Sequence, residues 1–149
     1  MRSFQANNKY NFILNLFTSF GYFDNDSDNK KVLKNIDNSL KEKGIFILDF
    51  INTKKAIKEL KEFEEKKINN INFKIEKYYD KKFIYKKIII TDQKKSHVFT
   101  EKVRILTQQH FTSYIKNLDI NLLHVFGDYN FTEFNPLLSE RLLLVFQKH

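Results

Sequence analysis

The chain has 149 residues, of which 42% are hydrophobic and 30% are charged, and its 26 basic and 18 acidic residues give a net charge of +8. This length and composition are typical of one soluble globular domain with its own core and exclude a disordered chain. The absence of cysteine excludes disulfides and thiolate metal sites. No apolar run approaches the roughly 18 residues of a membrane span, and residues 1–10 lack the pattern of a signal peptide. We therefore expect a cytoplasmic protein.

The basic excess has two interpretations. It could form a surface that binds nucleic acid or another polyanion. However, 23 of the 26 basic residues are lysines and only Arg2, Arg104 and Arg141 are arginines, whereas recognition of phosphates and bases favours arginine. The lysines are also interleaved with acidic residues, as from Glu62 to Lys67, which is typical of a solvated surface.

The first predicted elements form a parallel βαβ unit. The apolar run from Asn11 to Phe17 predicts a strand buried on both faces, because it shows no alternation. A polar loop follows, and Asp28 is a candidate N-cap for a helix that ends near Gly44. The run from Ile45 to Phe50 predicts a second buried strand. The inward face of the intervening helix would carry Val32, Leu33, Ile36 and Leu40.

The first strand presents a mismatch. If the sheet began near Tyr10, this strand would lie at an open edge, although its composition is that of a strand with neighbours on both sides. An apolar strand at an exposed edge promotes aggregation. The sequence therefore reads as though strands that belong before it are absent.

The middle of the chain changes its period. We expect a second helix over Lys54–Lys66, capped by Asn52 or Thr53, with an inward face of Ala56, Ile57, Leu60 and Phe63. After it, alternating residues predict an antiparallel meander with one face at least partly wet. Its strands would span residues 72–79, 83–91 and 97–106.

The end of the chain predicts one more helix and two strands. Thr107 is a plausible cap for a helix whose apolar residues Phe111, Tyr114, Ile115 and Leu118 follow helical spacing. Strands over residues 121–126 and 141–147 are joined by a loop that holds the chain's only proline, Pro136. Two strands joined in this way suggest a closing antiparallel hairpin.

These segments, in this order, resemble a known family. The residues Tyr10–Phe23 resemble the fourth strand and following loop of class I S-adenosylmethionine-dependent methyltransferases. The next helix, Gly44 and the strand Ile45–Phe50 resemble the family's next helix and fifth strand, and residues 119–148, with Gly127-Asp-Tyr129, resemble its closing hairpin. The resemblance covers nearly the whole chain.

The resemblance implies a fold, a cofactor and a reaction. The fold would be α/β, a partial Rossmann-like methyltransferase sheet with the βαβ unit, the C-terminal antiparallel hairpin and an inserted antiparallel β-meander. Residues 1–149 would be a single, incomplete methyltransferase domain, with residues 71–106 as the insert. The reaction would transfer a methyl group from S-adenosylmethionine, bound at the carboxyl ends of the strands, where open α/β sheets bind ligands.

The chain also departs from the family's pattern. The glycine-rich turn, the acidic residue for the ribose and the Asp for the adenine would all precede Met1, and no G-x-G occurs in the sequence. Asn11 stands where the family usually has Asp. These departures suggest a truncated chain that is weak or inactive alone, or one whose N-terminal half is supplied by a separate partner.

The resemblance assigns candidate site residues. Those expected to contact the cofactor are Met1, Arg2, Asn15, Leu16 and Phe17. Those expected to contact the acceptor are Ser19, Tyr22, Phe23 and Tyr129. Aromatic rings in the loop would favour the sulfonium cation, but Phe17, Phe20 and Phe23 could equally be core residues, and Tyr129 could serve packing.

No catalytic residue is assigned with the same support. Asp49, near the end of the second buried strand, is the best-placed candidate general base, with a capping or turn role as the alternative. The four histidines are scattered without carboxylates at metal-ligand spacing, so no metal is expected.

The acceptor and partners stay open. A small-molecule acceptor is expected, although the fold also hosts other acceptors. The meander could shape the acceptor pocket or a contact with a second copy of the chain. The alternative function is a non-catalytic basic module that binds RNA or an acidic protein through the lysine-rich segment Lys74–Lys102, and no membrane is expected as a partner.

Overall fold

The computed structural model describes residues 3, 6–92 and 95–149 and divides into two compact units. Met1 and Arg2, two of the expected cofactor contacts, lie outside the described residues. The main unit comprises Met1–Ala56 and Leu106–His149, and the hairpin unit comprises Ile57–Ile105.

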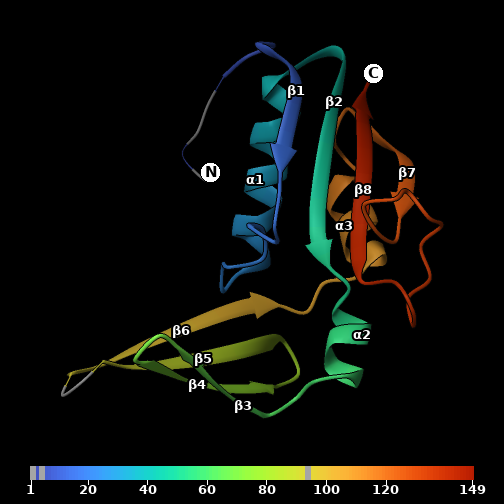
Figure 1. Ribbon diagram of the computed structural model, residues 1–149. Coiled ribbons are helices and arrows are strands. Elements are labelled where there is room, and N and C mark those ends of the chain that lie inside the picture. Colours follow the sequence, from blue (N-terminus) through green and yellow to red (C-terminus); the bar gives the residue numbers. More distant parts are fainter. Residues whose placement is uncertain (1–2, 4–5, 93–94) are drawn as a thin grey trace. The chain divides into compact units, whose positions relative to one another are not determined.

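The main unit contains a mixed sheet with the strand order β1-β2-β8-β7, here called sheet A (Figure 1). Strand β1 (Tyr10–Asn15) pairs in parallel with β2 (Leu40–Ile51), and α1 (Asp26–Ser39) connects them. Strand β8 (Arg141–Lys148) is antiparallel to both β2 and β7 (Ile120–Phe126). The predicted βαβ unit and closing hairpin are therefore confirmed.

Helices α1 and α3 (Gln108–Ile115) lie on the same side of sheet A (Figure 1). The ring of Phe111 in α3 lies 5.5 Å from that of Phe20 and 5.4 Å from that of Phe50. Val32, Leu33 and Ile36 of α1 are buried, as their spacing predicted. The core of the main unit thus lies between this face of the sheet and the two helices.

The other face of β1 differs from its prediction. Phe12 and Leu14 are 67% and 56% exposed, so the prediction of a strand buried on both faces is wrong. Alternate residues of a strand point to opposite faces, and these two point away from the side that α1 covers. Among the described residues, β2 is the only strand that pairs with β1, so β1 forms an edge of sheet A.

The predicted ends of the first helix are also wrong. The helix begins at Asp26, after the N-cap Asn25, and ends at Ser39. It stops there because Leu40 is extended and fully buried opposite Tyr10 in the sheet. Gly44 is therefore not a helix cap but a residue of β2. A Cβ atom on it would lie 2.7 Å from the carbonyl oxygen of Lys41, so the close approach of the backbone requires glycine.

The hairpin unit contains the predicted antiparallel meander, extended by one strand. Sheet B has the order β3-β4-β5-β6, and all three pairings are antiparallel. Its strands are β3 (Phe63–Ile68), β4 (Ile71–Tyr79), β5 (Phe83–Asp92) and β6 (Lys95–Arg104).

The helix predicted over residues 54–66 is wrong in its second half. Helix α2 spans only Thr53–Lys58, and Phe63, expected to face inward, is 74% exposed in β3. The cause is a two-residue turn at Asn69-Asn70, where Asn69 has a φ of 53° and Ile68 pairs with Ile71. Asparagine tolerates this left-handed conformation, so the hairpin draws residues 63–68 into the sheet.

The start of the third helix is confirmed. Thr107 is its N-cap, and the backbone N–H of Thr107 donates to Nδ1 of His110 at 3.0 Å.

Across the described ranges of the chain, no helix is both long and apolar enough to cross a membrane.

Candidate functional site

A tight turn follows β1 at the carboxyl end of that strand. The backbone N–H of Ser19 donates to the carbonyl of Leu16 at 3.2 Å, and the two central residues, Phe17 and Thr18, have φ of 55° and 56°. A left-handed conformation is uncommon for bulky or β-branched residues and costs about 1–2 kcal/mol per residue. The surrounding contacts must therefore hold this turn in place.

Asp49 of β2 is the main contact that holds the turn. This carboxylate is 1% exposed, and its Oδ2 accepts a hydrogen bond from the backbone N–H of Phe17 at 2.8 Å. Its backbone carbonyl accepts the N–H of Thr18 at 3.0 Å. One buried residue thus binds both left-handed residues of the turn.

Arg141, the first residue of β8, completes the cluster. Its Nε lies 2.8 Å and its NH2 lies 2.6 Å from Oδ1 of Asp49, so the guanidinium binds the carboxylate through two nitrogens. The same NH2 donates to the hydroxyl of Thr18 at 2.9 Å. Charge-assisted hydrogen bonds with this geometry are among the stronger ones in proteins, and here they link the turn to two strands.

Tyr129, in the loop between β7 and β8, reaches the same carboxylate. Its hydroxyl donates to Oδ2 of Asp49 at 2.9 Å, while 58% of the residue is exposed. Burial of the hydroxyl end, together with the hydrogen bond to Asp49, raises the pKa of Tyr129 above its usual 10.0, and nearby Arg141 opposes this only partly. The phenol is therefore protonated at neutral pH.

Asp128 shapes the backbone next to Tyr129. Its Oδ1 accepts the backbone N–H groups of Asn130 and Thr132, and its Oδ2 accepts the hydroxyl of Thr132 at 2.8 Å. These bonds, led by the one from the Thr132 hydroxyl, lower the pKa of Asp128. Such a turn fixes the conformation from which Tyr129 points to Asp49.

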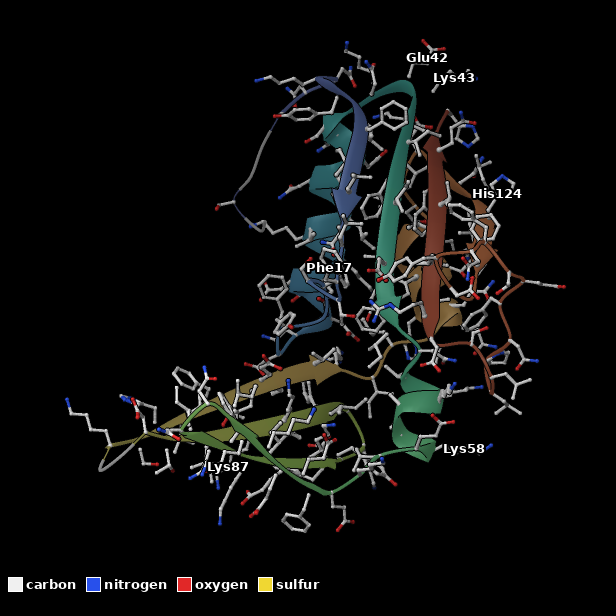
Figure 2. The ribbon with its side chains drawn as sticks, viewed as in Figure 1. Phe17, Glu42, Lys43, Lys58, Lys87 and His124 are labelled. Carbon is white, nitrogen blue, oxygen red and sulfur yellow. The ribbon has the colours of Figure 1, made fainter. Side chains whose placement is uncertain are left out.

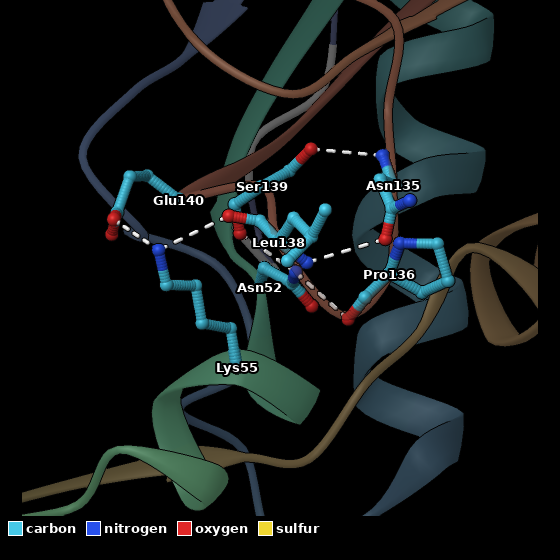
Figure 3. A network of polar contacts seen from close by, with 7 residues as sticks. All are labelled: Asn52, Lys55, Asn135, Pro136, Leu138, Ser139 and Glu140. Carbon is cyan, nitrogen blue, oxygen red and sulfur yellow. Dashed lines mark hydrogen bonds and ion pairs between the residues drawn. The ribbon is translucent and has the colours of Figure 1, made fainter.

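The rest of this loop is anchored to the end of β2 (Figure 3). The side-chain amide of Asn52 donates to the carbonyls of Pro136 at 3.1 Å and Ser139 at 2.7 Å. Lys55 donates to the carbonyl of Leu138 at 3.1 Å and forms an ion pair with Glu140. The loop that carries Tyr129 is therefore held by Asn52, which directly follows β2, and by Lys55 of α2.

The structure brings together some of the predicted site residues. Phe17, Asp49 and Tyr129 meet directly through hydrogen bonds, and the Ser19 hydroxyl donates to the side chain of Asn15 at 3.1 Å. Leu16 and Phe17 are exposed, Phe17 at 79%, in the loop after β1 (Figure 2). Phe17 is therefore not a core residue. Tyr22 is exposed and Phe23 is half-buried.

Phe20, another aromatic residue of this loop, is a core residue because it is only 1% exposed. Thr18 and Arg141 were missed by the sequence interpretation. The sequence held one indication of Arg141: it is one of only three arginines among 26 basic residues. A rare arginine in a lysine-rich chain indicates a position that needs the two-nitrogen binding of a guanidinium group.

A cavity of about 200 Å³ lies in the main unit where β2 ends and α3 begins. Its lining includes Asn52, Thr53, Gln108, Gln109, Phe134 and Pro136. None of the predicted acceptor residues lines it.

The hairpin unit carries most of the lysines that suggested a polyanion-binding surface. Four of the 13 lysines in this segment of the sequence pair across the strands of sheet B, in the pairs Lys74–Glu65, Lys77–Glu64, Lys86–Glu101 and Lys87–Glu76. Exposed pairs of this kind contribute little to stability, and each offsets the charge of one lysine.

Comparisons with known proteins support the architecture. No family model matches the sequence, and a search of curated proteins gave no match. Among solved structures, the chain is similar to an S-adenosylmethionine-dependent methyltransferase from Clostridium acetobutylicum ATCC 824, with a TM-score of 0.85 and 20% identity over 99% of this chain and 61% of that one.

Two further solved structures are also similar to this chain. The CcbJ methyltransferase from Streptomyces caelestis has a TM-score of 0.79 and 10% identity over 95% of this chain and 61% of that one. The amino pentose methyltransferase CalS10 from Micromonospora echinaspora, solved with S-adenosylmethionine bound, has a TM-score of 0.67 and 11% identity over 99% of this chain and 62% of that one.

These likenesses show the fold: the chain has the architecture of class I S-adenosylmethionine-dependent methyltransferases, as the sequence resemblance implied. The chain spans about three-fifths of the length of the structures that it matches.

Proposed function

We propose that this chain forms the acceptor side, and part of the cofactor site, of an S-adenosylmethionine-dependent methyltransferase that acts on a small molecule. The observation that carries the proposal is the left-handed turn at Phe17-Thr18, which the buried Asp49 binds through two backbone N–H groups. The turn lies at the carboxyl end of a parallel strand, where open α/β sheets bind their ligands. Strain of this kind persists where the surrounding structure enforces it and is common at ligand sites.

The chain's own residues fit one part of the cofactor. An exposed aromatic ring such as that of Phe17 attracts a cation such as a sulfonium, and Asn15 and Leu16 lie beside it in sequence. The cofactor, when bound, supplies the methyl group. The sequence contains no glycine-rich turn for the rest of the cofactor, and we propose that polypeptide outside residues 1–149 supplies those contacts.

The open side of β1 is where that polypeptide would pack. A groove of about 380 Å³ runs along β1 and α1 and is lined by apolar residues that include Phe12, Ile13, Val32 and Ile36. Parallel strands are usually covered on both faces. The exposed Phe12 and Leu14 mark the surface that would be buried.

Asp49 is better suited to positioning the turn than to acting as a general base. Both of its oxygens already accept hydrogen bonds, one from Arg141 and the other from Phe17 and Tyr129. Tyr129 is protonated at neutral pH and donates a hydrogen bond to Asp49, so its hydroxyl oxygen could still accept a hydrogen bond from an amine or hydroxyl of the substrate. Methyl transfer needs mainly alignment of donor and acceptor, which these residues would supply.

Titration with S-adenosylhomocysteine, followed by NMR of the backbone amides, tests the proposal. We expect weak binding by the isolated chain, with shifts concentrated at Leu16–Ser19, and loss of those shifts in Phe17→Ala. Phe12→Ala is the matched control, because Phe12 is also exposed but lies on β1 before the turn. Shifts centred elsewhere would refute the assignment of the turn, and tight one-to-one binding would refute the claim that the main cofactor contacts lie outside this chain.

A second candidate function rests on the charge of sheet B. One of its faces carries five basic residues (Lys67, Lys74, Lys87, Lys102 and Arg104) and two acidic ones (Glu65 and Glu76), together with the stacked rings of Tyr78 and Tyr85. Such a surface suits RNA or an acidic protein. Fluorescence anisotropy with a single-stranded RNA would show affinity that falls steeply as salt rises. Absence of binding at low salt would remove this candidate.

A further inference from the structure

The cavity of about 200 Å³ at the end of β2 has walls that are tied together by hydrogen bonds. The side-chain amide of Asn52 donates to the carbonyls of Pro136 and Ser139, and the hydroxyl of Thr53 donates to the carbonyl of Leu106 at 2.9 Å. Asn52 and Thr53 are only 4% and 1% exposed. These buried bonds join the segment after β2 to the loop before β8 and to the segment before α3. The cavity is therefore preformed, as ligand cavities usually are.

Apolar residues supply part of the lining. Leu106 and Leu142 are each 1% exposed, and the half-buried Phe134 lies beside Pro136 in the same lining. Burial of apolar groups favours an organic ligand, whereas an inorganic ion gains nothing from such residues. The volume of the cavity is about seven times that of a water molecule, which suits a molecule of one ring and one substituent.

Three polar residues of the lining have side chains that are not used by the protein. Among the residues that the structure describes, the side chains of Lys54, Gln108 and Gln109 form no hydrogen bond and no ion pair. The neighbouring lysine differs, because Lys55 donates to a backbone carbonyl and pairs with Glu140. Lys54, Gln108 and Gln109 therefore remain available to a ligand.

The charge of the lining favours an anion. Of the described residues that line the cavity, Lys54 alone is charged, and none is acidic. The ammonium group of Lys54 and the amide groups of Gln108 and Gln109 are hydrogen-bond donors, and a carboxylate is the organic group that accepts several such bonds at once. A cationic ligand would be repelled by Lys54, and a neutral one would leave its charge without a partner.

We propose that this cavity binds a small organic monocarboxylate. Its carboxylate would contact Lys54, Gln108 and Gln109, and its apolar body would lie against Leu106 and Leu142. The proposal goes beyond the enzymatic function and does not depend on it, because neither Asp49 nor any residue bound to its carboxylate lines this cavity.

The contacts set the expected strength. Lys54 is exposed, so water screens its charge and the ion pair adds only a modest amount. A ligand of about ten non-hydrogen atoms has little area to bury. We therefore expect a Kd in the millimolar range.

Benzoate and benzamide provide a matched pair of probes, because they share a ring and a similar shape but only benzoate is charged. In an NMR titration of the whole chain, millimolar benzoate should shift the backbone amides of residues 106–109, and benzamide should bind about tenfold more weakly. Lys54→Met should weaken benzoate about tenfold and leave benzamide unchanged. Lys58→Met is the control variant, because Lys58 lies in the same helix α2 but does not line the cavity, and it should bind benzoate like the unmodified chain.

Three results would overturn the proposal. The first is the absence of shifts at residues 106–109 with benzoate at about 50 mM, well above the expected Kd. The second is benzamide that binds as tightly as benzoate, or a Lys58→Met variant that weakens benzoate as much as Lys54→Met does, since either would show that Lys54 does not select the carboxylate. The third is a set of benzoate shifts centred on Leu16–Ser19, which would place the probe at the turn after β1.

Discussion

Replacing Asp49 with Asn tests whether the buried carboxylate holds the site together. The side chains are nearly isosteric, so the change removes the charge and one acceptor without altering the volume. The carboxylate accepts from Phe17, Tyr129 and Arg141. The amide has one oxygen for these donors, and its NH2 group would have to face one of them.

The contacts set the size of the effect. Asp49 is 1% exposed and the Arg141 side chain is 20% exposed, so the pair is largely buried. Removing one charge from a buried pair costs about 3–5 kcal/mol because the other charge is left without a partner, and the part of Arg141 that reaches solvent places this case at the lower end. A buried donor left unsatisfied adds about 1–3 kcal/mol. We expect Asp49→Asn to lower the free energy of unfolding by about 4–6 kcal/mol, a large share of the total for a small domain.

Urea unfolding, followed by far-UV circular dichroism, measures this loss. Asp37→Asn is the matched control, because Asp37 is also buried but its ion pair with Lys148 is looser, at 3.6 Å. We expect Asp37→Asn to cost clearly less. If Asp49→Asn cost under about 1 kcal/mol, less than a typical orphaned buried donor, or no more than Asp37→Asn, the carboxylate would not be what holds the turn.

Three further predictions concern other parts of the main unit. Gly44→Ala should lower the free energy of unfolding by about 1–3 kcal/mol, because the new Cβ would meet the backbone oxygens of Lys41 and Tyr10 at 2.7 Å and 3.2 Å. An unchanged urea midpoint would contradict the close approach. Asn52→Ala should lose the two hydrogen bonds to Pro136 and Ser139, costing about 2 kcal/mol, and should speed proteolysis within residues 127–139, whereas Asn130→Ala should not. Ultraviolet titration should show Tyr129 among the last tyrosines to ionise, since its pKa is raised, and Tyr129→Phe should remove that late step. Because the raised pKa means that the folded state favours the protonated phenol, its contribution to stability is present below about pH 10 and is lost as pH rises through the folded-state pKa; a Tyr129→Phe variant whose loss of stability is the same at pH 7 and above pH 11 would contradict this.

Much of the fold could be predicted because it depends on local patterns. The runs that became β1 and β2, with a periodic helix between them, indicated the βαβ unit, and Thr107 marked the start of α3. The failures came where tertiary contacts decide. Residues 63–66 have helical spacing but pair with β4, because the turn at Asn69-Asn70 places them opposite it.

The candidate site was predictable only in part. The predicted strand ends at Phe17 and Phe50 lie within two residues of the ends of β1 and β2. Phe17 and Tyr129 came from the resemblance, and Asp49 came from its position near the end of the second strand. Their contact with one another was not predictable, because it joins residues separated by 32 and 80 positions. Arg141, 92 residues from Asp49, is bound to it only because β8 pairs with β2.

The turn at Phe17-Thr18 is where local preference and observed conformation disagree most. Glycine or asparagine would adopt two successive left-handed residues at little cost, yet this chain has a bulky aromatic and a β-branched residue there. Sequences usually agree with their fold at every level, and exceptions concentrate at functional sites. If the turn served only to connect β1 to α1, Phe17→Gly should stabilise the chain without other effect. If the exposed ring contacts the cofactor, the same variant should gain stability and lose the S-adenosylhomocysteine-induced shifts at Leu16–Ser19. Measuring stability and binding on this one variant therefore separates a structural turn from a functional one.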